Sequence, residues 1–221
     1  MSFSQEWDKR YQEKTHMSVW PWSDVVSYVM RHARPAGESF RVLELGCGAG
    51  ANIPFFLSLG VEYHAIEGSP SIVGKLHERF PALTDNITVG DFTLDLPQAG
   101  EFDLVLDRAS LTHNATADIA RCLELVHRKL KSGGKFIGVD WFSSAYSDCR
   151  NGLPAGDAFT RQGYREGSFA DVGRVHFSDK SHLLELFGKF EMLVIEHKTV
   201  KRELPDDDWN FASWNFVARK A

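Results

Sequence analysis

The sequence predicts an α/β fold in which a parallel sheet is covered by helices on both faces, giving a three-layer α/β/α sandwich. Short apolar runs that suit buried strands alternate with stretches whose apolar residues recur at helical spacing. The chain has 221 residues, which suffice for one such domain with a modest insertion. Its hydrophobic content of 43% and charged content of 25% are those of a globular protein. We therefore expect a single domain over residues 1–221.

The first half of the chain alternates predicted strands with predicted helices. Val25, Val26 and Val29 recur at helical spacing, and the Pro-Ala-Gly sequence at 35–37 ends that segment. Residues 1–35 are therefore expected to form an N-terminal helical cap. The next predicted elements are a strand at 40–45, a helix at 51–59, a strand at 63–66, a helix at 71–80 and strands at 87–89 and 102–106.

The second half continues this pattern around one irregular region. Ile119, Cys122 and Val126 belong to an apolar helical stripe, and the Ser-Gly-Gly sequence at 132–134 ends that helix before a strand at 135–139. From 142 to 178 the periodicity fails, and we expect a long loop or small lid, which in a compact domain usually has a function. The last predicted elements are a helix at 180–187 and strands at 192–195 and 214–218.

A glycine-rich turn joins the first predicted strand to the helix after it. Residues 44–50 read Glu-Leu-Gly-Cys-Gly-Ala-Gly. Glycines let the backbone turn sharply and let a ligand approach without meeting a Cβ, and the amides at the following helix start suit a carboxylate or phosphate. The spacing is G-x-G-x-G, whereas a dinucleotide-binding turn reads G-x-G-x-x-G. The turn therefore predicts a nucleotide-type ligand and disfavours a nicotinamide cofactor.

With Glu44 two residues before the first glycine, the turn resembles motif I of the class I S-adenosylmethionine-dependent methyltransferases. Weaker motifs in the order of that family extend the resemblance from about residue 41 to residue 220. The resemblance implies a Rossmann-like, seven-stranded, mostly parallel sheet whose last strand is antiparallel. It also implies S-adenosylmethionine as cofactor and S-adenosylhomocysteine as product.

The resemblance assigns cofactor-binding roles residue by residue. Glu67, at the end of the second predicted strand, would accept hydrogen bonds from both ribose hydroxyls. Asp91 would hold the adenine amino group and Phe92 would pack on the ring, with a turn-capping role for Asp91 as the alternative. Glu44 could do no more than orient the glycine turn. The cofactor-binding candidates are Glu44, Gly46, Cys47, Gly48, Gly50, Asn52, Glu67, Gly68, Ser69, Asp91, Phe92, Asp107, Arg108 and Trp20.

Two histidines are candidates for a catalytic base. Residues 107–113 resemble the family segment that lines the methionine end of the cofactor and the acceptor pocket. His113 ends this segment, and imidazole titrates near neutral pH, although a structural role is the alternative. His176 lies in the irregular region and is the second catalytic candidate. Arg108 could hold a carboxylate of the cofactor or of the acceptor, or could pair with an acid.

Aromatic residues gather in two regions that are expected to cover the site. Following the resemblance, Trp20 and Trp22 would fold over the cofactor and shield its sulfonium from water. The region 142–178 is expected to form the acceptor pocket, and its candidate acceptor contacts are Tyr146, Tyr164, Arg165 and Phe169, with lid packing as the alternative. The nine histidines show no H-x-x-x-H or similar spacing, so we predict no metal.

These observations predict in-line transfer of a methyl group to an O, N or S atom of a small-molecule acceptor. Residues 107–110 read Asp-Arg-Ala-Ser, whereas DNA and RNA adenine or cytosine methyltransferases typically have Asn/Asp-Pro-Pro-Tyr/Phe after the fourth strand. The net charge of −5 also disfavours binding to phosphate backbones, so we expect no nucleic-acid partner. Two alternatives remain, a non-catalytic S-adenosylmethionine-binding module and a nicotinamide-dependent oxidoreductase.

Composition also predicts the cellular compartment of the protein. No apolar run approaches the roughly 18 residues that a membrane span needs. The three cysteines are too few and too scattered for a disulfide framework, which favours a reducing compartment. We expect a cytoplasmic monomer or homodimer without membrane contact.

Overall fold

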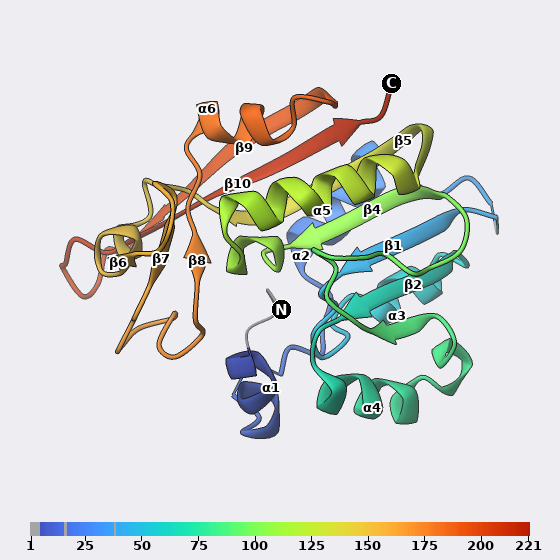
Figure 1. Ribbon diagram of the computed structural model, residues 1–221, viewed down its shortest axis with the longest axis horizontal. Helices are drawn as coiled ribbons and strands as arrows, with labels where there is room; N and C mark the ends of the chain where they lie inside the picture. Colours follow the sequence, from blue (N-terminus) through green and yellow to red (C-terminus); the bar gives the residue numbers. More distant parts are fainter. Residues whose placement is uncertain (1–4, 16, 38) are drawn as a thin grey trace.

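A seven-stranded sheet forms the centre of the computed structural model, which describes residues 5–15, 17–37 and 39–221 (Figure 1). Its order is β3-β2-β1-β4-β5-β10-β9. The strands are β1 (Arg41–Leu45), β2 (Glu62–Glu67), β3 (Ile87–Val89), β4 (Phe102–Arg108), β5 (Leu130–Phe142), β9 (Glu191–Lys201) and β10 (Asn210–Arg219). Neighbouring strands from β3 to β5 pair in parallel, and β10 runs antiparallel to both β5 and β9. The predicted Rossmann-like fold, with its reversed last strand, is confirmed.

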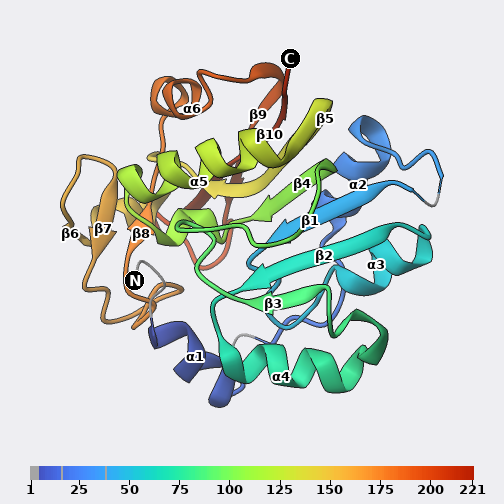
Figure 2. The same ribbon diagram turned by 45° about the vertical axis from the view of Figure 1, so that its right-hand side comes forward.

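Helices cover both faces of this sheet, as Figure 2 shows for α5 and α3. The helices on one face are α2 (Ser23–His32), α3 (Ile53–Ser58) and α4 (Pro70–Arg79), and those on the other are α5 (Thr116–Lys129) and α6 (Lys180–Leu186). Val29 and Phe56 belong to one apolar core, and Val126 and Leu183 belong to the other. Because both faces of the sheet are covered, the last four residues of β1 are all buried, and Glu44 is one of them.

The start of β5 differs from the sequence-based prediction. The Ser-Gly-Gly sequence at 132–134 lies within the strand, because Leu130 already pairs with Phe102 before a register shift in β4. Gly133 adopts a left-handed φ of 75°, and its amide donates to the carbonyl of Lys220. The glycines therefore form an irregularity inside β5 and not a loop ahead of it.

The region 142–178 holds a second, small sheet at the left of Figure 1. Its strands are β6 (Leu153–Pro154), β7 (Thr160–Gln162) and β8 (Val175–His176), in the order β6-β7-β8. The region expected to be a long loop or small lid therefore contains some regular structure, which the sequence did not reveal because strands of two or three residues are too short to produce a periodic pattern. Phe169 and Phe177 give this region an apolar core of its own, which continues into Phe142 of β5.

Helix α1 (Gln5–Gln12) bridges the main sheet and this small sheet region. The Asp8 carboxylate accepts hydrogen bonds from the Ser69 hydroxyl and from the Ser71 amide at the start of α4. On its other side, Arg10 Nη2 donates to Asp171 Oδ2 over 2.8 Å. Within residues 5–15, 17–37 and 39–221, no helix has the length and apolar character needed to cross a bilayer.

Candidate cofactor and acceptor site

A cavity of about 610 Å³ lies at the carboxyl ends of the parallel strands. Gly46 after β1, Glu67 of β2, Arg108 of β4 and Phe142 of β5 all line it. Since β10 is antiparallel, its amino-terminal end reaches the same edge of the sheet and contributes Phe211. This edge is where open α/β sheets bind their ligands. The predicted site residues that line the cavity are Glu44, Gly46, Cys47, Gly48, Asn52, Glu67, Phe92, Arg108, His113, Tyr146 and Phe169.

The glycines of the turn differ in what they face. Gly48 has a φ of 51° and lines the cavity, and a Cβ at this position would lie 2.9 Å from the Tyr11 hydroxyl of α1. Gly50 does not line the cavity. It packs instead against α4, where an added Cβ would lie 2.7 Å from Leu76 Cδ2. The predicted cofactor contact of Gly50 is therefore replaced by close packing of the turn against a helix.

Glu67 is held rigidly beside the glycine turn. Its Oε2 accepts a hydrogen bond from the Gly48 amide at 2.9 Å, and its Oε1 accepts one from the Ser69 amide at 3.0 Å. The residue is only 4% exposed, and burial raises the pKa of its carboxyl while the backbone amides oppose that change. A carboxylate has about four acceptor sites, so both oxygens keep capacity for a further hydrogen bond.

Each oxygen of the Glu44 carboxylate accepts a hydrogen bond from a neighbouring side chain. Asn52 Nδ2 donates to its Oε1 over 2.8 Å, and the Tyr63 hydroxyl donates to its Oε2 over 2.7 Å. Burial raises the pKa of this carboxyl to about 7. Asn52 Oδ1 in turn accepts from the backbone amide of Trp22. These bonds support the alternative that Glu44 orients the turn, and they identify Tyr63 as a supporting residue that the sequence analysis missed.

Gly68, Ser69 and Asp91 lie outside the cavity lining. The Ser69 side chain caps α4 by accepting from the Ile72 amide at 3.2 Å. Asp91 Oδ1 accepts from the amide of Thr93 at 3.0 Å and from its hydroxyl at 2.7 Å. These two hydrogen bonds fit the turn-capping alternative for Asp91, and the turn that it closes presents Phe92 to the cavity.

Asp107 is a correction to the predicted cofactor set. Its carboxylate is fully buried and accepts hydrogen bonds from the Leu111 amide at 3.0 Å and from the Ser110 hydroxyl. Burial raises its pKa to about 6. Successive residues of a strand point to opposite faces, so Asp107 turns inward while Arg108 reaches the cavity. Asp107 therefore fixes the short helix η2 (Leu111–His113) from behind.

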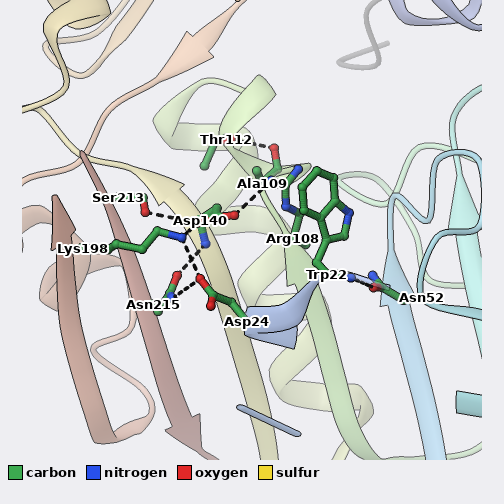
Figure 3. Close-up of polar contacts among 10 residues, drawn as sticks. All are labelled: Trp22, Asp24, Asn52, Arg108, Ala109, Thr112, Asp140, Lys198, Ser213 and Asn215. Atoms are coloured by element: carbon green, nitrogen blue, oxygen red, sulfur yellow. Dashed lines mark hydrogen bonds and ion pairs between the residues drawn. The ribbon is translucent and has the colours of Figure 1, made fainter. Parts of the chain in front are cut away.

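Of the two tryptophans expected over the cofactor, Trp22 reaches the cavity and Trp20 does not. Trp20 is 80% exposed and outside the cavity lining, so the structure does not bring it to the site, and its cofactor contact stays a prediction. The Trp22 ring lies 3.6 Å from the Arg108 guanidinium carbon, a cation–π contact (Figure 3). Trp7 and Tyr11 of α1 also line the cavity.

His113 lies at the end of η2 with its ring in the cavity wall. Its Nδ1 is 3.1 Å from the carbonyl oxygen of Arg174. A carbonyl can only accept a hydrogen bond, so Nδ1 carries the proton and the neutral ring has its lone pair on Nε2. The ring meets Trp7 edge-on, with the ring centres 4.8 Å apart. This tautomer is the one in which Nε2 can accept a proton.

An aromatic wall faces the glycine turn across the cavity. We define it as Phe142, Tyr146, Phe169, Trp209 and Phe211. Two predicted acceptor contacts, Tyr164 and Arg165, do not line the cavity, because Tyr164 is buried in the small-sheet region and Arg165 is exposed to solvent. Trp209 and Phe211 were missed, since nothing in the sequence indicates that the start of the reversed strand reaches this edge.

His176 is the second catalytic candidate, and the structure contradicts that role. It is fully buried away from the cavity, with its Nε2 3.2 Å from His182 Nε2 and its Nδ1 3.3 Å from the Thr160 hydroxyl. The His182 ring also stacks on Phe159 at 3.6 Å. Burial lowers the pKa of His176 to about 3. His176 therefore belongs to a neutral, packed histidine pair that joins β8 to α6.

The histidine pair predicts a loss of stability in acid. Because the folded pKa of His176 lies below the ordinary 6.5, the unfolded chain takes up a proton that the folded chain refuses, and stability falls as the pH drops below about 6.5. Between pH 7 and pH 5, protonation of this histidine in the unfolded chain should lower the free energy of unfolding by about 2 kcal/mol. We expect the unfolding free energy of the wild type, measured in urea, to fall by about that much more than that of His176→Asn. Equal pH dependence in the two proteins would contradict the assignment.

No cluster of three or more His, Cys, Asp or Glu side chains suited to a metal ion occurs among the residues that the structure describes.

The reversed strand and the ligand edge define an α/β protein that binds a nucleotide-type cofactor, and comparisons with known proteins narrow this class. The family model described as a methyltransferase domain matches residues 42–134. A protein of Encephalitozoon cuniculi described as a methyltransferase is 30% identical over 166 residues, which are 74% of this chain and 75% of that protein. The chain belongs to the class I S-adenosylmethionine-dependent methyltransferases, and its cofactor is S-adenosylmethionine.

Two further relatives match over shorter stretches. An uncharacterized methyltransferase of Synechocystis sp. is 34% identical over 101 residues, which are 45% of this chain and 46% of that protein. The ubiquinone biosynthesis O-methyltransferase of Xanthomonas axonopodis pv. citri is 35% identical over 117 residues, which are 51% of this chain and 46% of that enzyme. These matches thus span about half the length of either relative.

Solved structures share the fold. A methyltransferase of Methanosarcina mazei superposes with a TM-score of 0.67 at 17% identity, covering 91% of this chain and 98% of that one. The N-methyltransferase NodS of Bradyrhizobium japonicum, solved with S-adenosylhomocysteine, superposes with a TM-score of 0.63 at 15% identity, covering 98% and 99%.

The cavity fits S-adenosylmethionine on its own geometry. Glu67 offers a rigid, buried carboxylate with spare acceptor capacity, which suits a ribose diol. Gly48 brings its backbone to the cavity wall beside the Tyr11 hydroxyl, and Phe92 offers an apolar side chain against which a purine can pack.

Proposed function

We propose that this protein transfers a methyl group from S-adenosylmethionine to a hydroxyl oxygen of a small, flat and largely apolar acceptor. One observation carries the proposal: a single cavity joins the glycine turn and Glu67 at one end to the aromatic wall and His113 at the other. A cofactor and an acceptor bound there would share one space. The proposal treats residues 1–221 as one methyltransferase domain with region 142–178 as its acceptor lid.

Cofactor binding is assigned to residues around the glycine turn. Glu67 would accept hydrogen bonds from both ribose hydroxyls, the backbone at Gly48 would lie beside the amino-acid tail, and Phe92 would pack on the adenine. Contact of Asp91 with the adenine amino group stays a prediction. When bound, the cofactor supplies an electrophilic methyl group on a sulfonium, so the chain needs to align the acceptor and to exclude water.

Acceptor binding is assigned to the aromatic wall. Phe142 and Tyr146 present ring faces and edges that suit a planar apolar molecule. His113 stands in the same cavity with Nδ1 donating to Arg174, so Nε2 is the nitrogen able to take the proton of an acceptor hydroxyl. This proton transfer is needed for a hydroxyl of high pKa, whereas an amine or thiol can lose its proton to solvent.

Direct binding measurements test the proposal. We expect calorimetry to detect 1:1 binding of S-adenosylhomocysteine, a rise in melting temperature on its addition, and no binding of NADH. With S-adenosylmethionine carrying a labelled methyl group, label should appear on hydroxylated aromatic acceptors from a broad panel. Cofactor binding without transfer to any acceptor would favour the non-catalytic alternative, and NADH binding alone would favour an oxidoreductase.

A further inference from the structure

Arg108 is the only Lys or Arg among the described residues that line the cavity. It is the last residue of β4, and 28% of its side chain is exposed. The acidic residues of the lining, Glu44 and Glu67, lie at the glycine turn. Arg108 is therefore the one fixed cation available to an anionic ligand group in a cavity with mostly apolar walls, where charge-assisted hydrogen bonds are strong.

The guanidinium is directed away from the glycine turn. Arg108 Nη2 donates to Asp140 Oδ2 over 3.0 Å, and Asp140 belongs to β5, on the opposite side of β4 from β1 (Figure 3). The Trp22 ring covers one face of the guanidinium. The next residue, Ala109, packs with the aromatic wall, which Phe142 continues at the end of β5. Arg108 is thus anchored toward the acceptor half of the cavity.

A partly buried polar network fixes Asp140, the partner of Arg108 (Figure 3). Lys198 Nζ lies 2.6 Å from both Asp140 Oδ1 and Asp24 Oδ2. Asn215 Oδ1 accepts from the Asp140 amide at 2.8 Å, and its Nδ2 donates to Asp24. The cations Arg108 and Lys198 balance the charges of Asp24 and Asp140. Because Asp140 also accepts a hydrogen bond from Lys198, it orients Arg108 but does not bind it exclusively.

The backbone at this point is strained. Ala109 has a φ of 57° and Asp140 a φ of 54°, both left-handed, and the Ala109 amide donates to the carbonyl of Val139 at 3.1 Å. A non-glycine residue is disfavoured in this region, because its Cβ lies too close to the following carbonyl oxygen. Such strain gathers at functional sites, where surrounding contacts hold it. Here it occurs at the ends of two neighbouring strands, directly beside Arg108.

The guanidinium keeps donors to spare. Of the three guanidinium nitrogens, only Nη2 donates to Asp140. The Nε–H group has no hydrogen-bond partner within the part of the chain that the structure describes. A guanidinium carries five N–H donors in a planar fork that matches the two oxygens of a carboxylate. An arginine held by one acid, stacked on one ring and left with unused donors is arranged to receive an anion.

We propose that Arg108 binds a carboxylate of the methyl acceptor, so that the acceptor is a planar, largely apolar acid with its ring against the aromatic wall. The inference rests on the proposed function and adds the charge of the substrate to it. The cofactor also has a carboxylate in its amino-acid tail. The test must therefore separate these two sources of the same chemical group.

Matched acid and amide pairs test whether Arg108 binds a carboxylate of the acceptor. Benzoate with benzamide, phenylacetate with phenylacetamide, and indole-3-acetate with indole-3-acetamide are titrated by calorimetry, both with and without S-adenosylhomocysteine. We expect the wild type to bind at least one acid at least 10-fold more tightly than its amide. Arg108→Gln should reduce that ratio to below about twofold, and Arg108→Lys, which keeps the charge but loses the planar fork, should give an intermediate value. Arg165→Gln, the same substitution at an exposed arginine outside the cavity lining, serves as the control that keeps the ratio.

The cofactor arm compares S-adenosylhomocysteine with 5′-methylthioadenosine, which lacks the amino-acid tail. Arg108→Gln should change both affinities by less than about threefold. A selective loss for S-adenosylhomocysteine would assign Arg108 to the cofactor and overturn the proposal. Acids bound no better than amides, or a preference that survives in Arg108→Gln, would overturn it too. If acids are preferred while S-adenosylhomocysteine does not bind, the anion site stands and the proposed function fails.

Discussion

Replacing Glu67 with alanine is expected to weaken the binding of S-adenosylhomocysteine at least about 100-fold. The change would remove two charge-assisted hydrogen bonds to the ribose, each worth about 1.5–3 kcal/mol. It would also remove the acceptor of the Gly48 amide, which fixes the glycine turn. Calorimetry with S-adenosylhomocysteine gives the affinity directly, and the ligand-induced rise in melting temperature should largely disappear.

The expected loss can be separated from a loss of folding. Burial raises the pKa of the Glu67 carboxyl, so the charged group is costly to keep in the unliganded protein. Glu67→Gln keeps the shape and one accepting oxygen, so it should lower the melting temperature of the unliganded protein less than Glu67→Ala while still weakening binding. Glu62→Ala, at the other end of β2 and 45% exposed, is the matched control. Retention of wild-type affinity by a folded Glu67→Ala protein would refute the ribose assignment.

The central sheet could be predicted because its physical signals are local. The strand predicted at 87–89 has the bounds of β3, and the apolar runs before and after it became buried strands. The glycine turn could be predicted as well, because the left-handed φ of 51° at Gly48 is a conformation that favours glycine. In both cases a few consecutive residues carry the whole signal.

The misassigned site residues depend on contacts between distant parts of the chain. Asp107 and Arg108 are adjacent on a strand buried on both faces, so no alternation in the sequence shows which one reaches the cavity. His176 could be excluded only once its contact with His182 was known. Trp209 reaches the site because β10 is reversed, which is a property of the whole sheet.

The substitution His113→Asn is expected to lower kcat for a hydroxyl acceptor by about 100-fold or more, with the affinity for S-adenosylhomocysteine retained. The Asn side chain can still donate to the carbonyl of Arg174, but it offers no basic nitrogen. The loss should therefore come from the proton transfer and not from the position of the loop. Turnover of S-adenosylmethionine with hydroxybenzoates measures it.

A matched thiol acceptor separates catalysis from structure at this position. A mercaptobenzoate loses its proton to solvent far more readily than the corresponding hydroxybenzoate, because a thiol is the stronger acid. We expect His113→Asn to slow transfer to the hydroxybenzoate and to leave transfer to the mercaptobenzoate within about threefold of wild type. If both acceptors slow equally, His113 shapes the pocket against Trp7 and Phe142 and does not act as a base. If neither slows, the acceptor proton leaves by another route, and the preference for oxygen loses its support.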